Sequence, residues 1–180
     1  LVCLVGSEMC IRDRITTDHA VVGWGDPGLP DLHGMYWSSS NDFTEAMYYR
    51  LAQAVSFSNS FIKNASELSG DEVNVFIAEA RFLRAYAYYN LLDLYGNVPL
   101  TTEISTELPT QSNRTELFNF IESELMEIES ILLASNEYGR VDNVAAHALL
   151  SRLYPMLKLG LVRTDTVSYT HLRAHETHEN

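Results

Sequence analysis

Long apolar runs are missing from this sequence, and basic residues are few. No stretch is apolar over the roughly 20 residues that a membrane-spanning helix needs, so no such helix is predicted. Only 12 Lys and Arg stand against 24 Asp and Glu, which gives a formal net charge of −12. Nucleic acids and anionic membranes bind to basic surfaces, so we expect no nucleic-acid partner.

Cysteine is nearly absent, with Cys3 and Cys10 as the two examples. Six residues separate them, which does not match the CxxC spacing of metal and redox sites. Cys3 also lacks the small residue and the charged and apolar run that precede a lipoprotein cysteine, and no ordinary signal peptide is visible. The two cysteines therefore predict neither a metal site nor a lipid anchor.

Recognisable catalytic motifs are lacking too. The sequence has no GxSxG, HExxH or P-loop pattern, each of which carries a known chemistry. A glycosidase needs two carboxylates that flank one cleft, and no such pair stands out. His19, His33 and His147 are isolated in the sequence, and we expect structural or surface roles for them. The sequence therefore predicts a protein that is not an enzyme and needs no cofactor.

Both ends of the chain look foreign to the protein. Residues 1–14 (LVCLVGSEMCIRDR) and 167–180 (VSYTHLRAHETHEN) resemble peptides translated from sequencing-adapter DNA, and we exclude them from the fold. His171, His175 and His178 have the i, i+4, i+7 spacing that stacks imidazoles for a zinc ion. Under this interpretation that spacing is a chance product, so no metal site is predicted.

A second irregularity begins at Pro155, which interrupts a run at residues 149–154 that looks like a buried helix. A proline inside a helix costs about 3 kcal/mol. Residues 156–164, back-translated and read one base over, allow NAEAWTGT, so we interpret residues 155–166 as a frameshifted continuation. The predicted organisation is an artefact at 1–14, a helical region at 15–154, this continuation at 155–166 and a second artefact at 167–180.

Four amphipathic helices are predicted, at residues 44–63, 71–94, 115–133 and 143–154. Apolar residues recur there with the 3.6-residue period of a helix. Asp42 with Glu45, and Ser69 with Glu72, have capping-box spacing, while Gly96 ends the second helix. Asn143 is predicted to cap the fourth helix. The side chains expected to face inward are Met47, Leu51, Ala54, Val55, Phe61 and Ile62, then Val73, Phe76, Ile77, Ala80, Leu83, Ala87, Leu91 and Leu94, then Leu117, Ile121, Leu125, Ile128 and Leu132, then Ala145, Ala148, Leu149 and Leu153.

The helices of each pair are offset by roughly 28 residues, which is typical of helix-turn-helix units in a repeat array. Such units bury their faces only by stacking on neighbours, so we expect the isolated chain to be marginally stable. The acidic side chains of the third helix are expected to be solvated and to form no metal or acid-base site. They are Glu122, Glu124, Glu127 and Glu129. The predicted fold class is all-α, an irregular tetratricopeptide-like scaffold with long loops.

Several motifs occur in an order that resembles the SusD/RagB family. AEARFLRAY at residues 78–86 is followed by YGNVPL at 95–100, and TDHA at 17–20, YGR at 138–140 and LLSRLY at 149–154 also fit. The resemblance covers nearly all of residues 15–154. Physically, these residues suit structural roles, so we interpret them as marks of the fold and not of a ligand site. They are Glu79, Arg81, Arg84, Tyr86, Gly96, Pro99, Gly139 and Arg140.

The resemblance implies a non-catalytic binding protein, lipid-anchored on the outer face of the outer membrane of Gram-negative bacteria. Family members form a lid on a TonB-dependent transporter and hold oligosaccharides or other nutrients for import, so a ligand of this kind and the transporter are the two expected partners. The anchoring cysteine, the later helices and the later loops of the family are not found in this chain. The alternative is a helical-repeat scaffold that binds proteins and no glycan.

The loop before the first predicted helix carries the candidate ligand contacts. Trp24, Tyr36 and Trp37 are flat aromatic residues that suit the C–H faces of a sugar ring. Asp26 and Asn41 could pair with sugar hydroxyls. Glycine and proline within residues 23–30 exclude regular structure there. The alternative is that Trp24 and Trp37 pin the loop to the scaffold.

Overall fold

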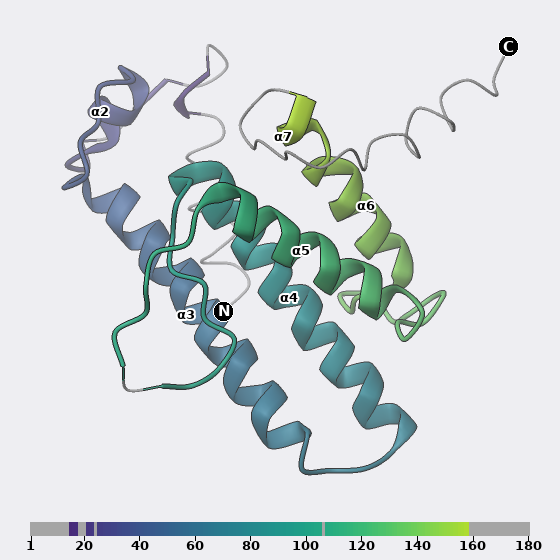
Figure 1. The fold of residues 1–180 in the computed structure, drawn as a ribbon. Helices are drawn as coiled ribbons and strands as arrows, with labels where there is room; N and C mark the ends of the chain where they lie inside the picture. Colours follow the sequence, from purple (N-terminus) through teal and green to yellow (C-terminus); the bar gives the residue numbers. More distant parts are fainter. Residues whose placement is uncertain (1–14, 18–20, 24, 106, 159–180) are drawn as a thin grey trace, which may run out of the picture.

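The computed structural model describes residues 15–17, 21–23, 25–105 and 107–158. Within those ranges the secondary-structure elements are all helices, and the all-α prediction is confirmed (Figure 1). The single β-bridge found there joins Pro99 to Gln111. The helices are α2 (Leu29–His33), α3 (Asp42–Ala65), α4 (Asp71–Tyr95), α5 (Arg114–Glu129), α6 (Asn143–Leu153) and α7 (Pro155–Lys158).

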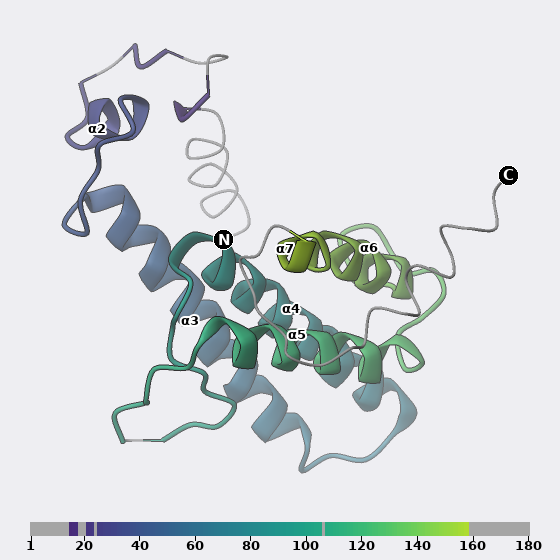
Figure 2. The ribbon, with the colours of Figure 1, turned by 45° about the horizontal axis from the view of Figure 1, so that its top comes forward.

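The long helices form two antiparallel pairs, α3 with α4 and α5 with α6. In both pairs the second helix begins 29 residues after the first, at 42 and 71 and at 114 and 143, close to the predicted interval. From α3 to α7 each helix packs on the next one in the chain, and α4 also contacts α6. Figures 1 and 2 show α4 between α3 and the second pair, with α2 at the N-terminal end of α3.

The predicted inward face of α5 is confirmed. The residues predicted for this face are at most 5% exposed, because the stripe they form faces α4 and α6 together. They are Leu117, Ile121, Leu125 and Ile128 on α5, and Leu132 just after the end of the helix. Leu149 and Leu153 of α6 are buried against the same core. On α6 the small residue that allows close packing is Ala146, whereas Ala148 is exposed.

The predicted inward face of α4 is correct only in part. Ala80, Ala87 and Leu91 are buried as predicted, whereas Leu83 is 53%, Leu94 40% and Phe76 39% exposed. Helices pack on α4 from two sides, so its buried surface is wide and includes alanines at which backbones approach closely. Its buried residues are Ala78, Ala80, Arg84, Ala85, Ala87, Tyr88, Asn90, Leu91 and Leu92. On α3, Ala54 and Phe61 are likewise exposed, while Met47, Leu51 and Val55 are buried.

The helix starts also differ from the predicted caps. Asn41, not Asp42, caps α3, and Asp142, not Asn143, caps α6. Gly70 precedes α4 without a side-chain cap. The capping box that does form lies at α5, between Asn113 and Glu116. Pro155 occupies the first position of α7, where a proline's missing N–H is not needed.

A buried ion cluster joins α4 to α5. Arg81 lies 2.6 Å from both Glu124 and Glu127, and Arg84 lies 2.6 Å from the other oxygen of Glu124. The side chain of Glu124 is only 10% exposed, so the prediction that it is solvated is wrong. The two arginines of α4 make its burial tolerable, because a buried carboxylate needs charged or hydrogen-bonding partners. Glu127, at 64% exposed, stays at the rim.

Arg84 extends the cluster to α3 and to the connection between α4 and α5. Its Nη1 donates to the Asn59 side-chain oxygen at 2.8 Å, and the Asn59 amide donates to the Thr101 carbonyl at 2.9 Å. Burial by itself raises the pKa of Glu124, but hydrogen bonds from Arg81 and Arg84 outweigh it and hold that pKa below its usual value. The cluster therefore fixes three helices and one loop.

The other signature residues also contact the scaffold. Arg140 pairs with Glu79 of α4 at 2.8 Å and lies over the Phe76 ring. Gly96 has φ +77°, and a side chain there would collide with the Arg114 guanidinium; glycine alone fits without strain. Tyr86 is 37% exposed and stacks on Phe82. Of the remaining two, Pro99 forms the β-bridge and Gly139, at φ +85°, turns the chain before α6.

Truncating a buried side chain of α5 should destabilise the protein far more than truncating an exposed one. Leu125→Ala should lower the free energy of unfolding by about 2–5 kcal/mol, because Leu125 is fully buried. Met126→Ala is the matched control on the same helix, since Met126 is 58% exposed. Urea denaturation followed by circular dichroism measures both. Equal effects would contradict the packing described.

The pH dependence of stability should report on Glu124. Its pKa is lowered in the folded state, so its contribution is present at neutral pH and is lost as the pH falls below about 4.3, the ordinary glutamate pKa. Glu124→Gln should cost about 3–5 kcal/mol at pH 7, because it leaves the buried Arg84 without a carboxylate partner, and should flatten the acid limb of the stability curve. Glu127→Gln is the exposed control, and an equal loss there would count against the cluster.

Candidate ligand-binding surface

A small second core holds the loop region at the start of α3. Ile15, Leu29 and Leu32 are buried together, with Val22 and Phe43 packed against them. His33 of α2 also contacts the carbonyl of Ile15 at 3.1 Å. Since Phe43 belongs to α3, this core anchors the described part of residues 15–41 to the scaffold. The structural role predicted for His33 agrees with its place here.

Asn41 orders the loop from within. Its side-chain oxygen accepts hydrogen bonds from the backbone N–H groups of Phe43 and Thr44, and its amide donates to the Gly28 carbonyl at 2.9 Å. The residue is 5% exposed. An asparagine at this position satisfies backbone donors that the first helical turn leaves unpaired. These contacts give Asn41 a positioning role and leave little of it to meet a ligand.

Tyr36 and Trp37 project from this ordered loop. Tyr36 is 67% and Trp37 41% exposed. The Tyr36 ring lies against Gly34, where any side chain would collide with it, and its backbone N–H donates to the Asp31 carbonyl. Two adjacent aromatic side chains are therefore presented to solvent on a loop with fixed contacts.

Asp26 and Trp24 are the other two residues predicted to contact a ligand. Asp26 is exposed, and its backbone carbonyl accepts from Leu29 N–H at 3.3 Å. Trp24 lies outside the described residues. Gly23, Gly25 and Gly28 have the spacing of a dinucleotide-binding loop, which requires a preceding strand and a following long helix. In the described part, the five-residue helix α2 follows and no strand precedes.

Metal ligation finds no support in the described ranges, where no group of three or more His, Cys, Asp or Glu residues gathers. Cys3, Cys10, His171, His175 and His178 lie outside them. His147 is on the surface, 3.3 Å from Glu129. None of the described helices combines the length and apolar character that crossing a bilayer requires.

A hollow that the sequence analysis missed lies between α3 and the connection from α4 to α5. We call it the α3 hollow. Its volume is about 350 Å³, and side chains from both walls line it. The helix wall includes Tyr48, Val55 and Ser56, and the loop wall includes Glu103, Ser105, Glu107 and Pro109. Figure 1 shows the loop arching out beside α3.

Hydrogen bonds at Thr101 fix one end of this loop. The Tyr88 hydroxyl accepts a hydrogen bond from the Thr101 N–H at 2.7 Å and donates one to the Thr101 carbonyl at 3.0 Å. Burial raises the pKa of Tyr88, so its hydroxyl keeps its proton at neutral pH. The other end is held by Gln111, whose amide donates to the Asn97 carbonyl at 2.8 Å. Residues 96–113 form a long connection, which is itself a signal of a functional loop.

Comparison with known proteins matches this architecture. A SusD-like family model, described as starch-binding and associating with the outer membrane, matches residues 31–155. The starch-binding protein SusD of Bacteroides thetaiotaomicron is 34% identical over 145 residues, which are 79% of this chain and 26% of SusD. The chain thus spans about a quarter of that relative's length.

Solved structures show the same fold. A SusD superfamily protein of Bacteroides vulgatus has a TM-score of 0.74 at 22% identity, over 82% of this chain and 34% of that chain. A structure with a xylogluco-oligosaccharide has a TM-score of 0.72 at 22% identity, over 83% of this chain and 30% of that chain. A laminarin-binding SusD-like protein has a TM-score of 0.70 at 19% identity, over 86% of this chain and 40% of that chain. Given the family match over most of its length, this chain belongs to the SusD-like family.

Proposed function

We propose that this chain is the N-terminal helical part of a longer cell-surface protein that captures oligosaccharides and does not cleave them. The observation that carries the proposal is the exposed pair Tyr36 and Trp37 on a loop ordered by Asn41. Family membership supports it, since the related SusD is a starch-binding protein. A solved relative with a xylogluco-oligosaccharide and a laminarin-binding relative also support it.

In this proposal the aromatic rings stack on sugar faces and the scaffold holds them ready. Tyr and Trp offer a flat apolar face with a polar edge, which suits a ring whose hydroxyls point outward. Because the loop is already ordered by Asn41 and the small core, binding costs little conformational entropy. Asp26, exposed in the same loop, is the polar partner. The ligand is an oligosaccharide, and the chain contributes no catalytic group.

The wider biological setting is also a proposal. The whole protein would be lipid-anchored at the outer membrane and would pass its ligand to a TonB-dependent transporter. The family description, association with the outer membrane, supports this location. Capture without cleavage agrees with transport as the next step, because an importer needs the intact oligosaccharide released to it.

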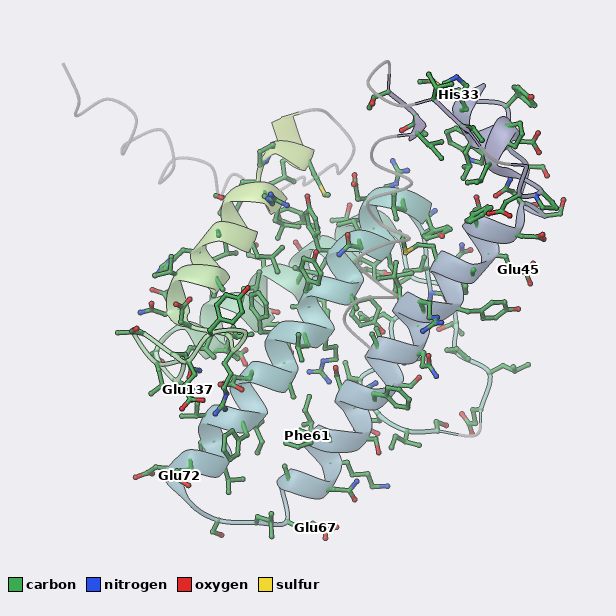
Figure 3. All side chains as sticks on the ribbon, turned by 180° about the vertical axis from the view of Figure 1, so that it is seen from behind. His33, Glu45, Phe61, Glu67, Glu72 and Glu137 are labelled. Atoms are coloured by element: carbon green, nitrogen blue, oxygen red, sulfur yellow. The ribbon has the colours of Figure 1, made fainter. Side chains whose placement is uncertain are left out.

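One observation favours a second function, protein binding by the helices. Two adjoining apolar hollows lie between α3 and α4. Their lining includes four side chains that are 39–59% exposed, those of Phe57, Phe61, Phe76 and Leu83. Figure 3 shows Phe61 at this face. Apolar patches of this kind mark interaction surfaces. Such a contact is compatible with glycan capture, since a transporter is itself a protein partner.

Removing either ring should weaken glycan binding without unfolding the protein. In the complete protein, Trp37→Ala or Tyr36→Ala should lower affinity for a bound oligosaccharide about tenfold, which corresponds to roughly 1.4 kcal/mol of lost contact. The melting temperature should stay within about 2 °C, since exposed side chains contribute little to stability. Isothermal titration calorimetry and thermal melting measure the two quantities.

Tyr138→Ala is the matched control, because Tyr138 is fully exposed on a distant turn. It should change neither affinity nor melting temperature. If Trp37→Ala lowers the melting temperature strongly and leaves affinity per folded molecule unchanged, the ring pins the loop and the sugar role is wrong. If neither ring variant changes affinity, the loop is not the binding surface.

A further inference from the structure

The α3 hollow is preformed. Its volume of about 350 Å³ lies within the range of small-molecule sites, roughly 300–1,000 Å³. One wall is helix α3, and the other is held by hydrogen bonds from Asn59 and Tyr88 to Thr101. Because Asn59 is in turn held by Arg84, the wall is tied to the buried ion cluster. A ligand entering here would not have to order the loop first.

The helix wall offers an apolar face with a free polar tip. The Tyr48 ring is half-buried and packs edge-on against Tyr95, with ring centres 5.3 Å apart. Its hydroxyl has no hydrogen-bond partner among the described residues, although the residue lines the hollow. Val55 and Leu91 extend the apolar surface. An aromatic ring that is fixed in place beside a small cavity is suited to a ligand with both C–H faces and hydroxyls.

The loop wall adds acceptors and no cation. Glu103 and Glu107 both line the hollow, and no lysine or arginine does. Neither carboxylate has a hydrogen-bond or ion-pair partner in the described ranges, and an ionised carboxylate only accepts hydrogen bonds. A ligand must therefore bring donors. Two unpaired carboxylates also repel anionic ligands, an effect that the net charge of −12 reinforces.

We propose that the α3 hollow is a second sugar subsite, which takes one neutral sugar unit and rejects uronic or sulfated sugars. Hydroxyls of the sugar donate to Glu103 and Glu107, and its apolar face lies on Tyr48. The inference rests on the proposed function, because it adds a contact to the same glycan capture. It is separate from the aromatic loop in the sequence, since its residues come from the body of α3 and from the connection between α4 and α5.

A bulky side chain should close the hollow. Ser56 lines it from α3, so Ser56→Trp fills it, whereas Gln53→Trp adds the same bulk to an exposed position on α3 that does not line it. The probes are maltoheptaose, a xyloglucan heptasaccharide and laminarihexaose, each titrated calorimetrically into the complete protein. For the probe that binds most tightly, Ser56→Trp should weaken affinity at least about tenfold relative to Gln53→Trp, with both variants melting like the parent.

The outcome separates this inference from the proposed function. If Trp37→Ala weakens binding but Ser56→Trp matches Gln53→Trp, the hollow is not a subsite and the aromatic loop stands. If Ser56→Trp weakens binding and the loop variants do not, the hollow stands and the loop assignment falls. If none of the three probes binds the complete protein, both are overturned.

A double variant tests the predicted rejection of acidic sugars and does not depend on filling the hollow. Glu103→Gln with Glu107→Gln should weaken binding of the neutral probe by about fivefold, because two charge-assisted hydrogen bonds become neutral ones. The same double variant should raise the affinity for hexagalacturonate, the acidic probe, above that of the parent. Tighter binding of hexagalacturonate than of any neutral probe by the parent would overturn the proposal. So would binding of spermidine that Ser56→Trp abolishes, since the hollow would then be a cation site.

Discussion

Arg84 is the side chain on which the arrangement of this protein depends. It is 6% exposed, and a buried guanidinium is tolerated only where its charge and donors find partners. Those partners come from three different elements: Glu124 of α5, Asn59 of α3 and the Thr102 carbonyl of the following loop. Apolar packing alone would allow the helices to slide or rotate with modest loss. A cation with directional donors permits one relative placement, so the cluster specifies the scaffold more than it stabilises it.

The positions of the two proposed ligand surfaces follow from this placement. Residues 99–111 are tied at one end to α3 and α4, through hydrogen bonds from Asn59 and Tyr88 to Thr101. At the other end Gln111 donates to the carbonyl of Asn97, just after α4. The α3 hollow therefore takes its shape from α3 and α4. The aromatic loop reaches the N-terminal end of α3 through Asn41 and Phe43. Both surfaces thus share α3 as a common support (Figures 1 and 2), and neither depends on α6 or α7. A rigid element that carries two binding loops keeps them in constant register, which suits recognition of an extended chain.

Much of the fold could be predicted from the sequence, because the period of apolar residues and the residues that begin or end helices act locally. The four long helices lie within a few residues of their predicted positions, and the stripe on α5 is correct because that helix has one dominant buried face. The predicted face of α4 was wrong in part for a physical reason: helices pack on α4 from two sides, so Ala78 and Ala85 are in the core while Leu83 is not. Glu124 was misjudged because its partners, Arg81 and Arg84, are about forty residues away. The aromatic loop could be singled out from its residue types, and its role in ligand binding stays a prediction. The hollow depends on how a long connection is tethered, which no local pattern encodes.

The order of packing has a consequence for how the chain acquires its structure. Contacts run from α3 to α4, from α4 to α5 and from α5 to α6, with only a minor contact that skips a helix. Pairings between consecutive elements close short loops, and chains rich in them fold quickly. Each long helix after α3 therefore finds a packing partner already synthesised when it leaves the ribosome. The hairpin of α3 and α4 can form first and offer Arg81 and Arg84 as a template, and α5 completes the cluster as soon as Glu124 has been synthesised.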